Sequence, residues 1–317
     1  IESDIATLSS SSYSGAGTLV IEPSSQSFSS PVTIETTKFS SLDSLVLGKT
    51  GNDMRIVINS DLTLDGALLV RGPLTLGADV TTAGAQTYSG DVTIDGPAIS
   101  LSTVGNSSSG SVITFNGSIE GTTANVDGLF LLSGEGAITV SGGVGHTKAL
   151  AHLGMGGAGQ HTTSTQFTAG NQVGSVIVSG GVNVGAIHTA STDFDIELAA
   201  STGDVFIGSD ATFTNTGSLK LGSGSALQTV SVTGSINSTA NSLAKLGSNI
   251  TTTTTQSYGA VQLLADVTLG ANDSAVSFTG TVDSAAQGGH GLTVNTGTGA
   301  ITMSGKVGAG TDAALGS

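Results

Sequence analysis

The chain contains no cysteine and no tryptophan, and it has only four prolines among its 317 residues. The lack of cysteine excludes disulfide scaffolds, thiol enzymes and zinc or iron–sulfur sites with cysteine ligands. Collagen is excluded because it needs many prolines and a glycine at every third position. Aromatic residues make up 4% and charged residues 10% of the chain. The fold therefore has to be stabilised by aliphatic packing and hydrogen bonds rather than by cross-links.

Basic residues are also few: eight lysines and arginines stand against 23 acidic residues, which gives a formal net charge of −15. A nucleic-acid partner needs clustered lysine and arginine to displace counterions, and the two arginines, Arg55 and Arg71, stand apart. Anionic membrane surfaces are disfavoured for the same reason. No run of about 18 apolar residues is present, so we predict no membrane insertion.

Glycine, serine and threonine dominate the composition, with 48, 45 and 44 residues. They are poor helix formers, which argues against a coiled coil or a helical bundle. We do not predict intrinsic disorder, because a hydrophobic content of 37% provides enough apolar surface to form a core. The composition predicts extended, repetitive β structure.

Two segments of the chain are copies of one another. Residues 111–145 and 274–308 align without a gap at an offset of 163, with 14 identities in 35 positions. Upstream lies a second related pair, AGAQTYSGDVTI at 83–94 and TTTQSYGAVQLL at 253–264. A shorter similarity, at an offset of 38, relates GAITVSGGV (136–144) to GSVIVSGGV (174–182). This pattern indicates a repeat array that grew by copying.

Short runs of alternating apolar and polar residues recur along the chain, such as LTL (62–64), VTI (92–94) and ITV (138–140). Alternation places one apolar face inward, and the runs are too closely spaced for helices between them. A sandwich or barrel would need fewer and longer strands. We therefore predict an all-β fold, a parallel β-helix (β-solenoid), with coils of roughly 20–23 residues and about 14–16 coils in total.

The predicted organisation has two parts. Residues 1–33, rich in serine and proline, are expected to form an irregular N-terminal segment or the first coils, with a linker from a preceding domain as the alternative. Residues 34–317 are expected to form the solenoid array, with related copies near 83–145 and 253–308. The sequence begins at Ile1 with neither an initiator methionine nor a signal peptide, so we interpret the chain as a mature product or an excised segment. Both ends of a solenoid are open sheet edges, which pair with other chains unless capped.

Three stretches carry a recognisable pattern: TTAGAQTYSGDVTI (81–94), TTTTTQSYGAVQLLADVTLGA (251–271) and GLTVNTGTGAITMSGKVGAGTDAALGS (291–317). They resemble the repeats of filamentous haemagglutinin-like adhesins and other giant bacterial surface proteins. The resemblance extends over about two-thirds of the chain and is weakest before residue 60. It implies a right-handed parallel β-helix that is exported and acts as a surface fibre or adhesin.

Some β-helix proteins cleave polysaccharides, and one element of their sites is present. The GHG sequence at 289–291 matches an element of polygalacturonases. Those enzymes also need paired carboxylates and a basic residue for the substrate. The chain has no Asp-Asp pair, and Lys306 is the only basic residue after Lys245. In the aligned copy His290 replaces Asp127 at an ordinary turn position, so we predict no catalytic residues and no enzyme.

The histidines suggest a metal site, but their spacing does not support one. Three fall within 16 residues without i, i+4 or His-x-His spacing, so solvated turn positions explain them better. The five are His146, His152, His161, His188 and His290. Turn aspartates and asparagines could supply oxygen ligands for calcium, and GAGTD (308–312) partly matches the nonapeptide of calcium β-rolls. We predict no metal site and no cofactor, with weakly bound calcium left open.

Two threonine-rich runs, 212–216 and 251–255, raise an ice-binding interpretation. A flat threonine array needs Thr-x-Thr on the same face of every coil, and here the runs are sporadic. Asn-x-Ser/Thr sequons would matter only in eukaryotic secretion. The sequons begin at Asn106, Asn116, Asn237, Asn249 and Asn272.

These observations favour a non-enzymatic structural segment of a secreted bacterial cell-surface fibre, self-associating end to end through open β-sheet edges. The expected partners are further copies or repeats of the same chain, and the expected location is extracellular. The alternative is the stalk of a haemagglutinin-like adhesin that binds host or neighbouring cells, glycans or matrix. Its binding activity would then lie elsewhere or in surface loops such as 146–172.

Overall fold

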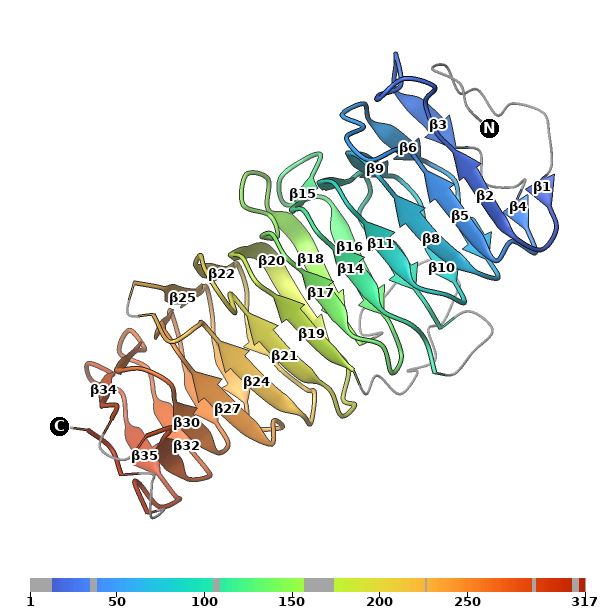
Figure 1. Ribbon diagram of the computed structural model, residues 1–317. Coiled ribbons are helices and arrows are strands. Elements are labelled where there is room, and N and C mark those ends of the chain that lie inside the picture. The colour runs from blue at the N-terminus through green and yellow to red at the C-terminus, as the bar shows by residue number, and fades with distance from the viewer. Residues whose placement is uncertain are drawn as a thin grey trace. The chain divides into compact units, whose positions relative to one another are not determined.

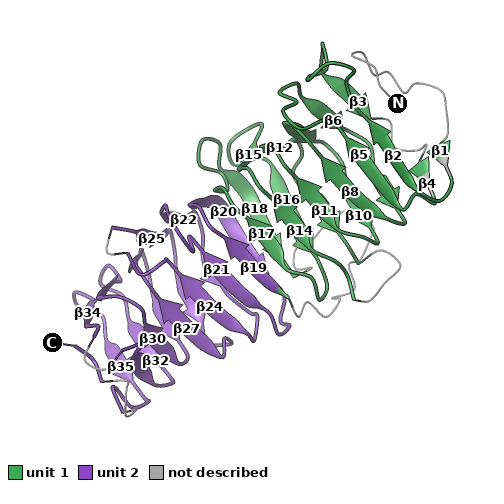
Figure 2. Cartoon of the chain, in the orientation of Figure 1, with its two compact units in different colours: residues 1–174 green, residues 175–317 purple. Residues whose placement is uncertain are grey.

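The computed structural model describes residues 13–34, 39–104, 109–156, 174–225, 227–286, 289–309 and 314–316. Within these ranges the regular secondary structure consists of β-strands alone, which confirms the predicted all-β class (Figure 1). The chain divides into two compact units, unit 1 (residues 1–174) and unit 2 (residues 175–317), coloured separately in Figure 2.

Most strands are three or four residues long. Those of unit 1 are β1 (Tyr13–Ser14), β2 (Thr18–Ile21), β3 (Val32–Ile34), β4 (Phe39–Ser40), β5 (Ser44–Leu47), β6 (Ile56–Ile58), β7 (Leu62–Leu64), β8 (Ala67–Val70), β9 (Leu74–Leu76), β10 (Val80–Thr82), β11 (Gln86–Tyr88), β12 (Val92–Ile94), β13 (Ile99–Ser102), β14 (Ile113–Phe115), β15 (Ile119–Gly121), β16 (Gly128–Leu132), β17 (Ile138–Val140) and β18 (Leu150–Met155). Those of unit 2 are β19 (Ser175–Val178), β20 (Val182–Thr189), β21 (Asp195–Leu198), β22 (Val205–Ile207), β23 (Ala211–Thr212), β24 (Ser218–Leu221), β25 (Thr229–Val232), β26 (Ile236–Ser238), β27 (Leu243–Leu246), β28 (Asn249–Thr252), β29 (Gln256–Tyr258), β30 (Val261–Leu263), β31 (Val267–Gly270), β32 (Val276–Phe278), β33 (Val282–Ser284), β34 (Leu292–Asn295) and β35 (Ile301–Met303).

The strands follow the alternation read from the sequence. In β7, Leu62 and Leu64 are buried and Thr63 between them is exposed. β12 and β17 also bury their first and last residues and turn the middle threonine outward. Each of these three strands thus contributes two side chains to the interior, because successive residues of a strand point to opposite faces.

The strands of unit 1 form parallel sheets in which each coil adds one strand per sheet. The orders are β2-β5-β8-β11-β14-β17, β3-β6-β9-β12-β15 and β7-β10-β13-β16-β18, and β1 pairs with β4. In unit 2 the orders are β19-β21-β24-β27-β30-β33, β20-β22-β25-β28-β31-β34 and β23-β26-β29-β32-β35. Most sheet neighbours are therefore one full coil apart in the chain, and the architecture is the predicted parallel β-helix.

Coil length varies more than the sequence suggested. Along one sheet of unit 1, the paired residues Leu45, Leu68, Gln86 and Ile113 are 23, 18 and 27 residues apart. The longest sheet of each unit has six strands among the described residues. Evenly sized coils would have given about 14–16 levels for the chain. The described spacings scatter around the expected coil length because turns of different length separate strands of nearly constant length, and residues outside the described ranges add no described level.

Residues 18–34 already belong to the coils, since β2 pairs with β5 and β3 pairs with β6. Residues 1–12 lie outside the described residues.

The two aligned copies fold alike. At the offset of 163, β14 to β17 of the first copy correspond to β32 to β35 of the second. Each copy ends in the same isolated parallel bridge, Ile119 to Val144 in unit 1 and Val282 to Val307 in unit 2. The sequence duplication is therefore also a structural duplication.

Inward-facing side chains stack in columns along each sheet. One column of unit 1 consists of Leu45, Leu68, Gln86, Ile113 and Ile138, all at most 1% exposed. Burying each aliphatic side chain contributes about 1.5–3 kcal/mol, so these columns form the core. Gln86 is the polar exception and leads to the first candidate site.

Candidate functional site

A buried cluster surrounds the glutamine in the core of unit 1. Gln86 Nε2 donates hydrogen bonds to the carbonyl oxygen of Ser102 (2.8 Å) and to Thr82 Oγ1 (3.2 Å). Gln86 Oε1 accepts one from the Tyr88 hydroxyl (2.9 Å). The ring of Phe115 stacks on Tyr88, with centroids 4.9 Å apart. The buried polar groups thus satisfy one another.

Unit 2 contains the same cluster. Gln256 Nε2 donates to the carbonyl oxygen of Gly270 (2.8 Å) and to Thr252 Oγ1 (3.2 Å), and its Oε1 accepts from the Tyr258 hydroxyl (2.8 Å). Phe278 stacks on Tyr258 at 5.5 Å. Burial raises the pKa of the tyrosine hydroxyl in both clusters, so each stays protonated as a donor. We call these two sets the Thr–Gln–Tyr clusters.

Aspartates at the turns join one coil to the next. The Oδ1 atom of each accepts the backbone N–H of a residue 23 to 27 positions further on, at 2.6–2.9 Å. We call them the corner aspartates: Asp91, Asp195, Asp204, Asp210, Asp266 and Asp273. A carboxylate that accepts a backbone N–H forms one of the stronger hydrogen bonds available in a turn.

Asp210 shows the electrostatic effect of such a contact. It accepts both the N–H (2.7 Å) and the Oγ–H (2.9 Å) of Ser235. The backbone hydrogen bond first, and the hydroxyl second, lower the pKa of the Asp210 carboxyl below its ordinary value of 3.8.

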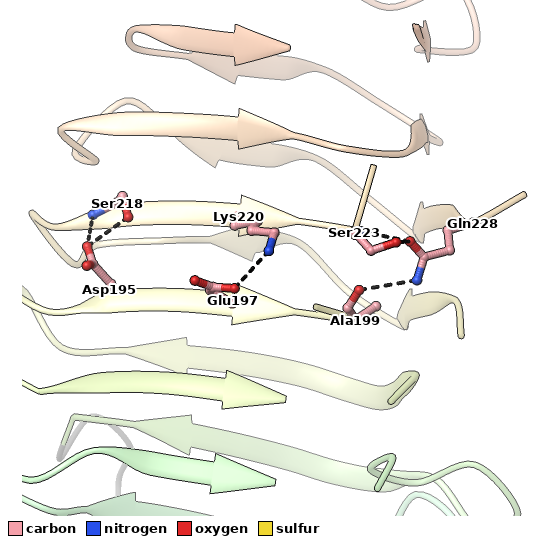
Figure 3. A network of polar contacts seen from close by, with 7 residues as sticks. All are labelled: Asp195, Glu197, Ala199, Ser218, Lys220, Ser223 and Gln228. Carbon is pink, nitrogen blue, oxygen red and sulfur yellow. Dashed lines mark hydrogen bonds and ion pairs between the residues drawn. The ribbon is translucent and has the colours of Figure 1, made fainter. Parts of the chain in front are cut away.

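A column of charged and polar side chains lies on the outer face of one sheet of unit 2. In register from β21 to β33 it contains Glu197, Lys220, Lys245, Gln262 and Asp283. Lys220 Nζ lies 2.9 Å from Glu197 Oε2 (Figure 3). Both side chains are partly exposed, so the pair contributes at most about 1 kcal/mol. Lys245 is the next residue of the column after Lys220, a like-charge neighbour that weakens this stretch.

The same view shows how one turn is closed. Gln228 Oε1 accepts the N–H (2.7 Å) and the hydroxyl of Ser223 (2.6 Å), and its Nε2 donates to the carbonyl oxygen of Ala199 at 3.2 Å (Figure 3). The glutamine thus connects Ser223 to Ala199 in the preceding coil.

The last described coil of unit 2 exposes side chains that face the core elsewhere. Ile301 is 49%, Met303 43% and Val307 44% exposed. Their equivalents in the first copy, Ile138, Val140 and Val144, are at most 1% exposed. We call Ile301, Met303 and Val307 the apolar edge. The contrast arises at matched positions of one repeat, so side-chain type does not account for it.

The histidines are not brought together. His146 and His152 are exposed and His188 is partly exposed, while His161 lies outside the described residues. The backbone carbonyl of His290 accepts the N–H of Gly316 at 2.7 Å. Among the described residues, no group of three or more His, Asp or Glu side chains is arranged to hold a metal ion.

The GHG element at 289–291 lies in the turn before β34. The N–H of Gly291 donates to the corner aspartate Asp266 (2.8 Å). Asp127, the counterpart of His290, is buried and accepts the N–H groups of Gly96 (2.9 Å) and Thr123 (2.8 Å). Both copies thus use the position for turn structure. Of GAGTD at 308–312, residues 310–312 lie outside the described residues.

The threonine runs do not form one face. Thr252 is buried and donates to the carbonyl oxygen of Thr254 (2.6 Å), whereas Thr251 faces outward. Asn116 and Asn272 lie at exposed turns, and Asn249 Oδ1 accepts the N–H of Thr268 (2.8 Å). Asn237 lies in β26. The expectation of a surface loop at 146–172 is wrong for residues 150–155, which form β18 and bury Leu150, Leu153 and Met155. Asn106 and residues 157–172 lie outside the described residues.

Sequence reasoning missed the corner aspartates and the Thr–Gln–Tyr clusters. The signal for the clusters was present, because Gln and Tyr recur at the same spacing in the related pair at 83–94 and 253–264. The aspartates could have been found from their positions at turns. Asp91 and Asp204, for example, each come directly before an apolar run.

Comparisons with known proteins identify no relative. No family model, no curated protein and no solved structure matches the chain. The described residues also contain no helix that is long and apolar enough to cross a bilayer.

Proposed function

We propose that the chain is a non-enzymatic structural segment of a secreted bacterial cell-surface fibre, which associates end to end through open β-sheet edges. The apolar edge is the observation that carries this proposal. Ile301, Met303 and Val307 are exposed where the copied residues of unit 1 are buried. An edge of this kind presents unpaired backbone groups beside an apolar surface, and such edges pair with other chains.

The partner in this proposal is a further copy or repeat of the same chain. β33, β34 and β35 are the last strands of their sheets among the described residues. An added coil would continue the hydrogen-bonding pattern of each sheet and bury the apolar edge. Burial of one such side chain contributes about 1.5–3 kcal/mol, so three in one contact give the association a substantial driving force.

A structural role also agrees with how the acidic residues are used. The corner aspartates accept backbone N–H groups of the next coil, so their chemistry serves the turns. The adhesin-stalk alternative shares the same rod-forming coils and differs in having its binding region elsewhere.

The test is negative-stain electron microscopy and sedimentation of the purified chain across a concentration series. We expect end-to-end assemblies that grow with concentration. Ile301→Asp should raise the concentration needed by at least about tenfold, since it removes more than 1.4 kcal/mol per contact. The matched control is Val126→Asp in unit 1, where the valine is equally exposed (51%).

A chain that stays monomeric at every concentration would contradict the proposal, and the adhesin stalk would then be the better candidate. Equal effects of Ile301→Asp and Val126→Asp would show that association does not use the apolar edge.

A further inference from the structure

The turn that closes β26 in unit 2 presents carbonyl oxygens to a glycine of the next coil. It comprises residues 238–241, and the N–H of Asn241 donates across it to the carbonyl oxygen of Ser238 (3.3 Å). A Cβ atom at Gly259 would have three carbonyl oxygens as its nearest neighbours outside the adjoining residues. They belong to Thr239 (3.4 Å), Asn241 (3.5 Å) and Ser238 (3.7 Å). The space beside Gly259 therefore has room for a small atom and is lined by oxygen.

Two side chains of the same turn carry unpaired oxygens. Ser238 Oγ and Asn241 Oδ1 are buried, and neither has a hydrogen-bond partner among the described residues. Both residues are at most 5% exposed. Turning the Asn241 amide round would not help, because its Nδ2 donates to the carbonyl oxygen (2.6 Å) and to Oδ1 (2.9 Å) of Asn215 in the preceding coil. Buried polar atoms of this kind destabilise a fold unless something pairs with them.

Neither the backbone nor the packing requires a glycine at position 259. The φ angle of Gly259 lies outside the left-handed region, and a Cβ atom 3.4–3.7 Å from its neighbours would make ordinary van der Waals contacts. Gly280 in the following coil is different, since a Cβ atom there would lie only 2.6 Å from the backbone nitrogen of Ala260. The effect of glycine at position 259 is to leave the space beside the carbonyl oxygens open.

The related segment of unit 1 lacks both the polar side chain and the open space. In the pair of segments that contains the glutamines and tyrosines of the two clusters, Ser89 aligns with Gly259. The residue paired with the tyrosine in the preceding coil is Val70 in unit 1 and Ser238 in unit 2. The N–H of Ser89 donates to the carbonyl oxygen of Val70 at 2.9 Å and closes the corner. An inward hydroxyl and an open space thus occur together in unit 2.

We infer that the turn at 238–241 and Gly259 form a binding site for one monovalent cation, Na⁺ or K⁺. Its ligands are drawn from the three carbonyl oxygens and the two unpaired side-chain oxygens. All five are neutral, which suits a singly charged ion, whereas Ca²⁺ sites usually include carboxylates. Carbonyl oxygens can replace the hydration shell of such an ion. This inference is independent of the proposed function.

A cation fits this set of oxygens better than a water molecule does. A water molecule has two hydrogens, so it can donate to only two of the acceptors, whereas a cation can contact several oxygens at once. The net charge of −15 also raises the concentration of cations near the chain.

The test measures the thermal stability of the full chain in the chlorides of K⁺, Na⁺ and choline. The three solutions have equal ionic strength, so general screening of the negative charge is the same in each. Choline is too large for a space that holds one small atom. We expect Tm to be at least about 3 °C higher in K⁺ or Na⁺ than in choline, because a ligand that binds only the folded chain stabilises it. The salt that gives the higher Tm identifies the preferred ion.

Two variants should abolish the difference between the salts. Gly259→Ala places a methyl group beside the three carbonyl oxygens, and Ser238→Val removes the unpaired hydroxyl and installs the residue of unit 1. The matched control is Gly77→Ala in unit 1, whose methyl group would also make ordinary contacts, at 3.6–3.7 Å, but mainly with carbon atoms of Asn59. Gly77→Ala should keep the full difference. In choline neither alanine variant should lower Tm, because alanine restricts the unfolded chain.

Equal Tm values of the wild-type chain in all three salts would overturn the inference and leave a buried water as the occupant of the site. A difference between salts that persists in both Gly259→Ala and Ser238→Val would also overturn it, because the cation would then bind elsewhere. The same conclusion follows if Gly77→Ala loses the difference to the same extent as Gly259→Ala.

Discussion

At the residue scale, the acidic side chains contribute to turn structure as well as to net charge. In the sequence alone, these side chains count only toward the net charge of −15. The structure adds that several aspartates accept backbone N–H groups across consecutive coils. At Asp210 these hydrogen bonds lower the pKa of the carboxyl, so part of the stability of the fold depends on pH.

Asp210→Asn tests this dependence at one position. The pKa of Asp210 is lowered in the folded chain, so its charged form stabilises the fold above the unfolded-state pKa, and this contribution is lost as the pH falls through the folded-state value. Asparagine can still accept the hydrogen bonds from Ser235 but does not titrate. We expect the wild type to be more stable than the variant at pH 6, and the difference in Tm to shrink towards pH 3.

The control for this experiment is Asp193→Asn, at an exposed aspartate outside the corner positions. A difference in Tm between wild type and Asp210→Asn that stays constant from pH 6 to pH 3 would contradict the assigned role.

At the scale of the strand, the Thr–Gln–Tyr clusters connect elements that aliphatic stacking alone would leave free to slide. In unit 2 the cluster joins β28 through Thr252, β29 through Gln256 and Tyr258, and β31 through the carbonyl oxygen of Gly270. Aliphatic side chains are similar to one another, so a column of them specifies register weakly. Buried hydrogen bonds have to be made in one register, because an unpaired buried polar group costs about 1–3 kcal/mol.

Gln256→Ala should therefore destabilise the chain strongly. It leaves the Tyr258 hydroxyl and the Gly270 carbonyl oxygen without this partner, and we expect a loss of about 2–4 kcal/mol in the free energy of unfolding. Gln262→Ala, on the outer face of the neighbouring β30, should change it by less than about 0.5 kcal/mol. Denaturant unfolding measures both, and similar losses for the two variants would show that the cluster has no special role.

The strands themselves could be predicted from the sequence, but their grouping into coils could not. Alternation in runs such as 62–64 and 138–140 identifies the inward positions, because a strand has a period of two. Coil length depends on turns, and nothing in the local pattern shows that Leu68 and Gln86 are separated by 18 residues and Gln86 and Ile113 by 27. The inward position of Gln86 could not be predicted either. A polar side chain is expected to face solvent unless its buried hydrogen-bond partners are known.

The candidate edge was predictable only in part. The sequence indicates that solenoid ends are open, and the duplication identifies the matched residues. That Ile301 is exposed while Ile138 is buried cannot be read from two matching sequences, and only the folded chain shows it.

At the scale of the whole molecule, net charge and the apolar edge act in opposite directions. Each chain carries −15 charges, so two chains repel one another at long range. Contact of the apolar edge is short-range and depends on burial. The balance between them is set by ionic strength.

End-to-end association should therefore become stronger as salt is added. Raising NaCl from about 20 mM to about 500 mM shortens the Debye length from about 20 Å to about 4 Å and removes most of the repulsion. We expect the concentration for half-maximal assembly to fall by about tenfold or more, as measured by sedimentation velocity. Weaker association at high salt would indicate that ion pairs, rather than apolar burial, hold the contact.

The duplicated segment also has a genetic consequence. The two copies contain corresponding strands, β14 to β17 and β32 to β35, and each closes with the same bridge, Ile119 to Val144 and Val282 to Val307. An in-frame duplication or deletion of such a segment by unequal recombination leaves intact hydrogen bonds on either side of the junction. Genes for chains of this kind can therefore gain or lose whole blocks without passing through a misfolded intermediate. Natural variants should differ in length by complete segments rather than by single residues.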